Sequence, residues 1–451
     1  MGRSFTAAPV RVLLAPPLLL LLFLLGLLRP AAANVGDSCS TSADCGAGQW
    51  CFDCEPKFSG SHCVRSSATN PFQLINNSLP FNKYAYLTTH NSYAIVGEPS
   101  HTGIPRVTFD NQEDTVTDQL NVVYLLILRL FQMSCSASFH PEWNSHSRGV
   151  CNGMQNGVRA LMLDTYDFKD DVWLCHSSGG KCNDFTAFVS TLNMPYNIST
   201  EGVSDCAEPA LDTFKEIEAF LSANPSEIVT IILEDYVHAP NGLTNVFNAS
   251  GLLKYWFPVS KMPQNGQDWP LVSDMVASNQ RLLVFTSISS KQSTEGIAYQ
   301  WNFMVENNCE ASIPVSFSFS FFFVWWIAAK LNATGMLEYN MLFHLVSDGD
   351  DGMDAGKCSN RAESAPLNDN TKSLVLMNYF PSVPVKLTAC LQHSQNLVDM
   401  VNTCYSAAGN RWANFIAVDY YKRSDGGGAF QATDLLNGRL LCGCQDIRAC
   451  S

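Results

Sequence analysis

The sequence lacks the short glycine-rich and nucleophile motifs of several common enzyme folds. No G-x-G-x-x-G follows its first predicted strand, and neither a P-loop nor a G-x-S-x-G elbow is present. These absences argue against a dinucleotide-binding domain, a P-loop nucleotide hydrolase and an α/β-hydrolase. No internal repeat with a period of about 20–50 residues is visible, which argues against a solenoid or a propeller.

Positive charge is also scarce in this chain. Only 15% of the residues are charged, and the formal net charge is −14. This balance argues against nucleic acid as a partner and against binding to an anionic bilayer by charge alone, although a local basic cleft is compatible with it. The chain has 451 residues, of which 46% are hydrophobic. That suffices for one large core of about 250–300 residues and a small additional segment.

Residues 1–33 have the three parts of a secretory signal peptide. Arg3 and Arg11 precede an apolar run over residues 18–28, and the small residues Ala31–Ala33 follow. We expect cleavage after Ala33 and a secreted or cell-surface protein, with a retained signal anchor as the alternative. The C-terminus has no hydrophobic tail, so we expect no signal for a lipid anchor in this chain.

Cysteine is abundant, with 17 residues. In a chain that enters the secretory route, we expect these cysteines in disulfides rather than in zinc sites. Residues 34–65 hold five of them among few apolar residues, which predicts a small segment stabilised by disulfides. Within it, Cys51-x-x-Cys54 is interpreted as structural rather than as a redox or metal motif. The chain also has four Asn-x-Ser/Thr sequons, which predict a glycoprotein; they begin at Asn76, Asn197, Asn248 and Asn332.

From residue 80 onward, short apolar segments alternate with amphipathic stretches. The apolar segments are strand candidates, at 85–89, 160–166, 228–233, 281–286, 374–378 and 414–420. Residues 210–223 have apolar side chains at helical spacing and are followed by Pro225, and 397–407 is a second helix candidate. This alternation predicts a parallel α/β fold, either a barrel or a doubly wound sheet.

Groups able to carry out acid–base chemistry lie at or near the ends of these segments. His90 follows the first strand candidate, Asp164 lies in the second, Glu234 follows the third and Asp419 lies near the end of the last. His176 comes 12 residues after Asp164, in a run that begins at Trp173. Catalytic residues of (β/α) barrels sit at the carboxyl ends of strands. Two histidines beside carboxylates suit an acid–base reaction near neutral pH.

This set of residues resembles the X domain of phosphatidylinositol-specific phospholipases C, and in particular the plant X-domain-containing proteins. The resemblance covers roughly residues 70–445 and depends most on residues 89–93 and 157–176. It implies a distorted (β/α)8 TIM-like barrel and a phosphoric diester hydrolase. It also implies a phosphoinositide-like lipid or another phosphodiester as substrate, met at a membrane surface. By position, His90 matches the general base of the family and His176 its general acid.

The resemblance further implies a calcium site, but an incomplete one. Asn91, Asp164 and Glu234 match three ligand positions of the calcium-dependent members, whereas Met162 stands where a further acid is expected. Three oxygen ligands and water can still hold Ca²⁺, so weakly bound Ca²⁺ is the expected cofactor. Bacterial members have an Arg in place of the metal, and Asp164 occupies that position here.

Two residues, Asp419 and Arg159, each have two possible roles. Asp419 is expected to orient a histidine, with the capping of a turn as its alternative. Arg159 is expected to pair with an acid outside the barrel, with contact to a phosphate on the rim as its alternative. If the two imidazoles serve one substrate, they should lie about 5–8 Å apart, because a phosphate must form hydrogen bonds to both.

Two segments, 121–155 and 309–347, do not fit the barrel pattern, and we interpret both as insertions that originate from retained introns or from gene-model errors. Without their three cysteines, 14 remain, an even number suited to pairing. Two other functions stay open. One is a catalytically inactive cell-surface barrel that binds a headgroup or glycan. The other is a disulfide-rich recognition protein that acts through residues 34–65.

Overall fold

The computed structural model describes residues 33–54, 60–75, 77–103, 106, 108–121, 157–177, 181–183, 204–308 and 353–450. Residues 1–32 of the predicted signal peptide lie outside the described residues, as do both predicted insertions apart from Asn121. The sequons at Asn76, Asn197 and Asn332 also lie outside, whereas Asn248 is exposed on a helix.

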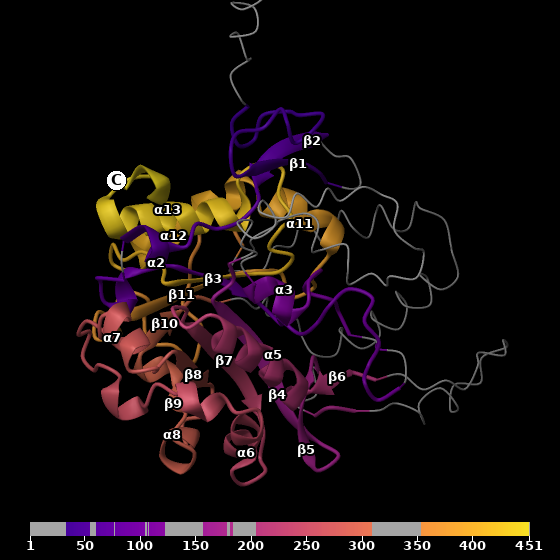
Figure 1. Ribbon diagram of the computed structural model, residues 1–451, viewed down its shortest axis with the longest axis vertical. Helices are drawn as coiled ribbons and strands as arrows, with labels where there is room; N and C mark the ends of the chain where they lie inside the picture. The colour runs from indigo at the N-terminus through magenta and orange to yellow at the C-terminus, as the bar shows by residue number, and fades with distance from the viewer. Residues whose placement is uncertain are drawn as a thin grey trace, which may run out of the picture.

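The centre of the described part is a curved parallel sheet whose strands follow one another around a barrel in chain order (Figure 1). The order is β10-β11-β12-β3-β4-β7-β8-β9, and all neighbours pair in parallel. The two outermost strands, β9 and β10, are consecutive in the chain, and within the described ranges no pairing joins them. The distorted (β/α)8 TIM-like barrel expected from the sequence is confirmed.

The barrel strands are β3 (Tyr86–Thr89), β4 (Ala160–Phe168), β7 (Val229–Tyr236), β8 (Leu282–Thr286), β9 (Ala298–Tyr299), β10 (Met304–Glu306), β11 (Leu374–Tyr379) and β12 (Phe415–Val418). The α-helices are α2 (Pro71–Ile75), α3 (Val116–Leu120), α5 (Ala210–Ala223), α6 (Gly242–Ala249), α7 (Val272–Ala277), α8 (Lys291–Thr294), α11 (Lys386–Gln392), α12 (Gln395–Ala407) and α13 (Gly428–Cys442). Short 3₁₀ turns lie at η1 (Phe81–Lys83), η3 (Leu252–Tyr255), η4 (Val259–Lys261), η5 (Gln300–Asn302) and η6 (Ile447–Ala449).

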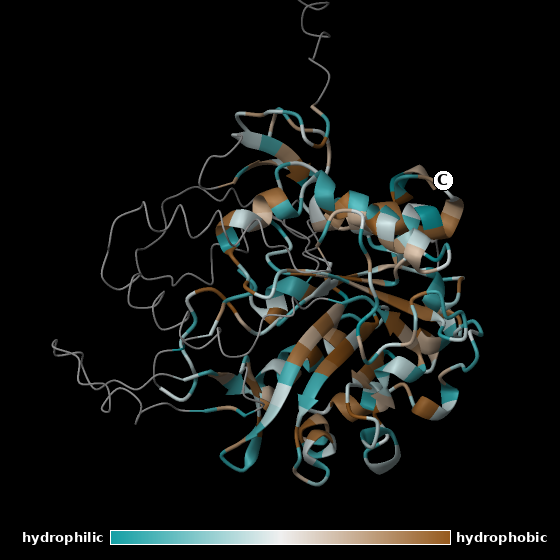
Figure 2. Ribbon diagram, turned by 180° about the vertical axis from the view of Figure 1, so that it is seen from behind, coloured by the Kyte–Doolittle hydropathy of each residue, from teal (hydrophilic) through white to brown (hydrophobic). Residues whose placement is uncertain are grey.

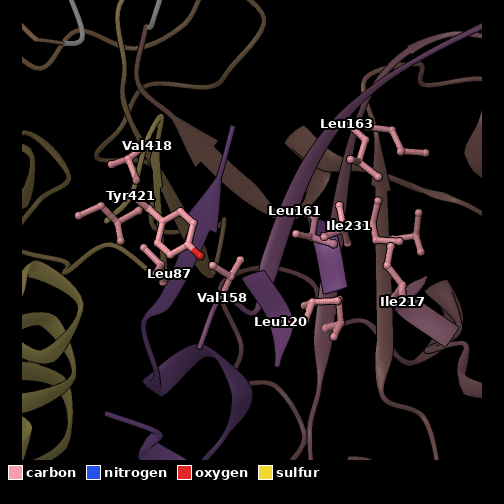
Figure 3. Packing of buried hydrophobic residues seen from close by; sticks show 14 of the residues in the cluster. Leu87, Leu120, Val158, Leu161, Leu163, Ile217, Ile231, Val418 and Tyr421 are labelled. Carbon is pink, nitrogen blue, oxygen red and sulfur yellow. The ribbon is translucent and has the colours of Figure 1, made fainter. Parts of the chain in front are cut away.

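Side chains of the barrel strands alternate between two hydrophobic layers. In β12, Phe415 and Ala417 belong to the layer inside the barrel, and Ile416 and Val418 to the layer between sheet and helices. This two-residue period is what a strand buried on both faces requires. Figure 3 shows the outer layer, where Ile217 of α5 packs toward the strands. Figure 2 shows the same pattern as hydrophobic strand interiors with hydrophilic ends on the long strands.

A hairpin extends from β4 beyond the barrel. Lys169 and Asp170 form its turn with positive φ angles of 50° and 61°. Strand β5 (Asp171–Cys175) then pairs antiparallel with β4, and β6 (Cys206–Pro209) pairs with β5. His176 therefore follows a strand of this hairpin, not one of the barrel strands. The sequence pattern did not reveal this element.

The N-terminal segment forms a second, two-stranded sheet. Strands β1 (Gln49–Asp53) and β2 (Ser61–Arg65) pair antiparallel, and disulfides Cys39–Cys51 and Cys45–Cys63 close the segment. Cys54 forms a disulfide with Cys390 of α11. The structural interpretation of Cys51-x-x-Cys54 is confirmed, because each cysteine has its own disulfide partner.

Elsewhere, Cys358–Cys404 and Cys442–Cys450 are disulfides. The complete pairing expected for 14 cysteines is wrong in two places. Cys182 lies within bonding reach of both Cys175 and Cys206, so these three sulfurs share one cluster. Cys444 has no disulfide partner within the described residues. In that same part of the chain, no helix combines the length and apolar character needed to cross a membrane.

Arg159 is buried beside β4 and pairs with Glu227, with 2.8 Å between Nε and Oε2. Its Nη1 donates to the backbone oxygens of Leu120 and Val158, and the guanidinium lies over the ring of Phe220. This arrangement confirms that Arg159 pairs with an acid. The partners of its guanidinium are residues that build the fold.

We expect Glu227→Ala to lower the free energy of unfolding by about 3–5 kcal/mol, because it leaves a buried guanidinium without its counter-ion. Urea denaturation measures the change. Replacing both partners with Met and Leu serves as the control and should recover much of the loss. An unchanged midpoint for Glu227→Ala would show that the pair has no structural role.

Candidate active site

The register between β12 and β3 places His90 beside Asp419. Val418 is paired with Thr89, so the next residue of each strand emerges at the same edge of the sheet. The His90 Nδ1 lies 3.0 Å from the Asp419 Oδ1. Asp419 is buried, and the Asn111 amide donates to the same Oδ1 at 2.9 Å. A carboxylate held in this way favours a proton on Nδ1 of His90, which leaves Nε2 as the basic nitrogen.

Phe380 restrains the His90 ring on its face. It follows β11, and its ring lies parallel to the imidazole with centroids 3.6 Å apart and planes inclined by 3°. His90 is therefore fixed at its edge by Asp419 and on its face by Phe380. Only 14% of the His90 side chain is exposed.

His176 faces His90 across the mouth of the barrel. The ring centroids lie 6.4 Å apart with planes inclined by 86°, a separation within the expected range. The His176 backbone N–H donates to the Asp205 carbonyl, and Tyr93 donates its hydroxyl to the carbonyl of Cys175. In the described structure the Nδ1 of His176 is buried without a hydrogen-bond partner. A buried ring nitrogen without a partner leaves its hydrogen-bonding capacity unused.

The pKa of His176 is lowered to about 4, mainly by burial; the nearby His90 and Arg106 also lower it, whereas Asp419 opposes them. His176 is therefore neutral near neutral pH when no ligand is bound. A general acid must be protonated, so this role requires a ligand whose negative charge favours the imidazolium.

Asp164 and Glu234 lie opposite each other on β4 and β7. Burial and the charge of Glu234 raise the pKa of Asp164 well above its usual range, while Arg361 opposes the shift. The Tyr236 hydroxyl donates to Glu234 at 2.6 Å. Two neighbouring carboxylates of this kind favour either a bound proton or a cation.

Asn91 is fully buried, and its amide lies 3.1 and 3.3 Å from the two carboxylate oxygens of Asp164. With its NH₂ turned toward them, the amide donates to Asp164; with its oxygen turned toward them, the two side chains can share a cation. Together with Glu234, these side chains offer oxygen atoms, the type of ligand that calcium binds. Met162, which precedes Asp164 by two residues, supplies no oxygen from its side chain.

Four further side chains at the mouth were missed by sequence reasoning. Glu306 ends β10, is fully buried and accepts hydrogen bonds from Gln300, Trp301 and Asn378. Arg361 lies 3.5 Å from Glu306. Because β10 has only three residues, no strand pattern indicated Glu306. Asn378 is the last residue of a predicted strand, so its position could have indicated that it lies at the mouth. No sequence pattern marked Phe380 or Arg361.

Replacing His90 with Gln should raise the pKa of His176, because the neighbouring imidazole disfavours the imidazolium form of His176. The pKa should remain below the ordinary value for histidine, since burial is the larger cause of the shift. NMR titration of the His176 ring measures the change. A lower or unchanged pKa in His90→Gln would contradict the proximity of the two rings.

Two comparisons with known proteins point to the same family. The model of the PI-PLC X domain family matches residues 198–316. The PI-PLC X domain-containing protein At5g67130 of Arabidopsis thaliana is 44% identical over 438 residues, which is 96% of this chain and 81% of the relative.

Two bacterial structures are similar at low identity. Phosphatidylinositol-specific phospholipase C from Listeria monocytogenes has a TM-score of 0.40 and 11% identity, over 78% of this chain and 93% of that one. The same enzyme from Staphylococcus aureus has a TM-score of 0.39 and 10% identity, over 81% and 95%. The extent and identity of the match to the Arabidopsis relative decide the family: this chain belongs to the PI-PLC X domain-containing proteins.

Proposed function

We propose that this protein is a phosphoric diester hydrolase of the phosphatidylinositol-specific phospholipase C type, with an inositol phosphodiester lipid headgroup as substrate. The observation that carries the proposal is the 6.4 Å separation of the His90 and His176 rings at the carboxyl edge of the barrel. A phosphate between them can accept a hydrogen bond from one ring while the other contacts the attacking hydroxyl.

In the proposed mechanism, His90 is the general base. Asp419 holds its Nδ1, and the free Nε2 takes the proton of the inositol hydroxyl as that oxygen attacks phosphorus. His176 gives a proton to the leaving oxygen of the diacylglycerol, so the two transfers balance. The products are diacylglycerol and a cyclic inositol phosphate, which water can then open.

Asn91, Asp164 and Glu234 would hold Ca²⁺ in this proposal. When bound, the ion supplies positive charge that stabilises the negative charge of the reacting phosphate. The raised pKa of Asp164, caused by burial and by Glu234, supports a cation at these carboxylates.

The disulfides support a further proposal, that the protein works outside the cell or on its surface. The substrate would then be met at the outer face of a membrane. Glycosylation at the exposed Asn248 is compatible with this location.

A second function, binding of a headgroup without turnover, is favoured by two specific observations. His176 is neutral near neutral pH in the unliganded protein, and Met162 stands where a further calcium-ligand acid is expected. The pocket would then recognise the headgroup and leave the diester intact.

Turnover of phosphatidylinositol and glycosyl-phosphatidylinositol vesicles, with Ca²⁺ or with a chelator, decides between these functions. We expect release of diacylglycerol by the unaltered protein, and a fall in kcat of roughly 10²–10⁴-fold for His90→Ala and for His176→Ala. Lys254→Gln, at an exposed residue of η3, is the control outside the mouth. Retained headgroup binding without any turnover would contradict the enzymatic proposal and support the second function.

The pH dependence gives a further prediction. The kcat/KM profile reports the free protein, where the pKa of His176 is about 4, and the kcat profile reports the complex. Because the anionic phosphate stabilises the imidazolium, the pKa of His176 should rise on binding. The decline of kcat with increasing pH should therefore begin at a higher pH than the decline of kcat/KM. Coincident declines would contradict His176 as the general acid beside the phosphate.

A further inference from the structure

The N-terminal segment, described over residues 34–54 and 60–65, contacts the two loops that flank His90. Cys54 is joined by a disulfide to Cys390 in α11, 336 residues away, and its sulfur lies 3.4 Å from the Ser424 carbonyl oxygen. Cys390 belongs to the connection after β11, and Ser424 belongs to the connection after β12. One buried residue of the small segment is thus bonded to the first connection and contacts the second.

These same two connections carry the groups that fix the His90 ring. Phe380, which stacks on the imidazole, lies between β11 and α11. Asp419, which binds the Nδ1, begins the connection from β12 to α13. Figure 1 shows the β1–β2 hairpin beside α11, at the same end of the molecule as α13.

Polar contacts reinforce the disulfide. His62 lies 3.2 Å from Asp425, and both side chains are largely buried. His393, directly after α11, is buried with its Nδ1 3.2 Å from the Arg423 carbonyl oxygen, which ties the two connections to each other. Arg65 forms an ion pair with Asp434 of α13.

We propose that the N-terminal segment is a positioning element of the active site. Through Cys54 it keeps Phe380 and Asp419 on the two sides of His90, so that the Nε2 of this histidine stays directed into the mouth. The part of the proposal that concerns rate rests on the proposed function, whereas the part that concerns the orientation of the ring does not. Loss of the link allows the two connections to separate, and a displacement of about 1 Å at a reacting group can lower a rate by up to 10²-fold.

The test compares two double variants of the full chain. C54S with C390S removes the link to the barrel, and C442S with C450S removes a disulfide outside the segment. We expect the first to lower kcat by roughly 10- to 100-fold with little change in KM, and the second to leave kcat close to that of the unaltered protein. Equal losses in both variants, or a change confined to KM, would overturn the proposal.

A spectroscopic measurement keeps this result separate from the proposed function. In protein with ¹⁵N-labelled histidine, His90 should show one tautomer with the proton on Nδ1, and C54S with C390S should average the two ring nitrogens. Unchanged signals overturn the proposal even if the protein shows no turnover. If that variant does not fold, His62→Gln serves instead. It removes the contact of His62 with Asp425, and so weakens the attachment of the segment to the connection after β12, with all disulfides intact. It should then shift the His90 signals in the same direction, and an absence of any shift overturns the proposal.

Discussion

The parallel register of β3 between β12 and β4 determines which side chains meet at the barrel mouth. Because Val418 pairs with Thr89, His90 and Asp419 emerge together although 329 residues separate them in the chain. The register of β4 with β7 places Asp164 opposite Glu234 in the same way. A shift of one residue in either pair would turn these side chains to the other face of the sheet. Hydrophobic layers on both faces hold the register in place.

Much of this barrel could be predicted because each long strand is a short apolar run that ends in polar residues. Six predicted segments correspond to β3, β4, β7, β8, β11 and β12, and the helix predicted over residues 210–223 matches α5. Strand ends also revealed His90, Asp164, Glu234 and Asp419. In a parallel barrel, the position of a residue in its own strand already indicates the edge at which it lies.

The remainder depends on contacts that leave no local pattern. Strands β9 and β10 have two and three residues, too few for a period, so Glu306 was not recognised. Phe380 looks like any buried aromatic residue in the sequence, and only the fold shows that it stacks on a histidine. The disulfide of Cys54 with Cys390 is equally hidden, because spacing does not specify connectivity among many cysteines.

Two histidines that act on one phosphodiester must respond to the same ligand. Titration with a non-hydrolysable inositol phosphonate, followed by the NMR signals of both imidazole rings, tests this most directly. The account predicts that the signals of His90 and His176 move together along one saturation curve, with His176 becoming protonated as the anion binds. Saturation that moves only one of the two rings, or neither of them, would contradict the central claim.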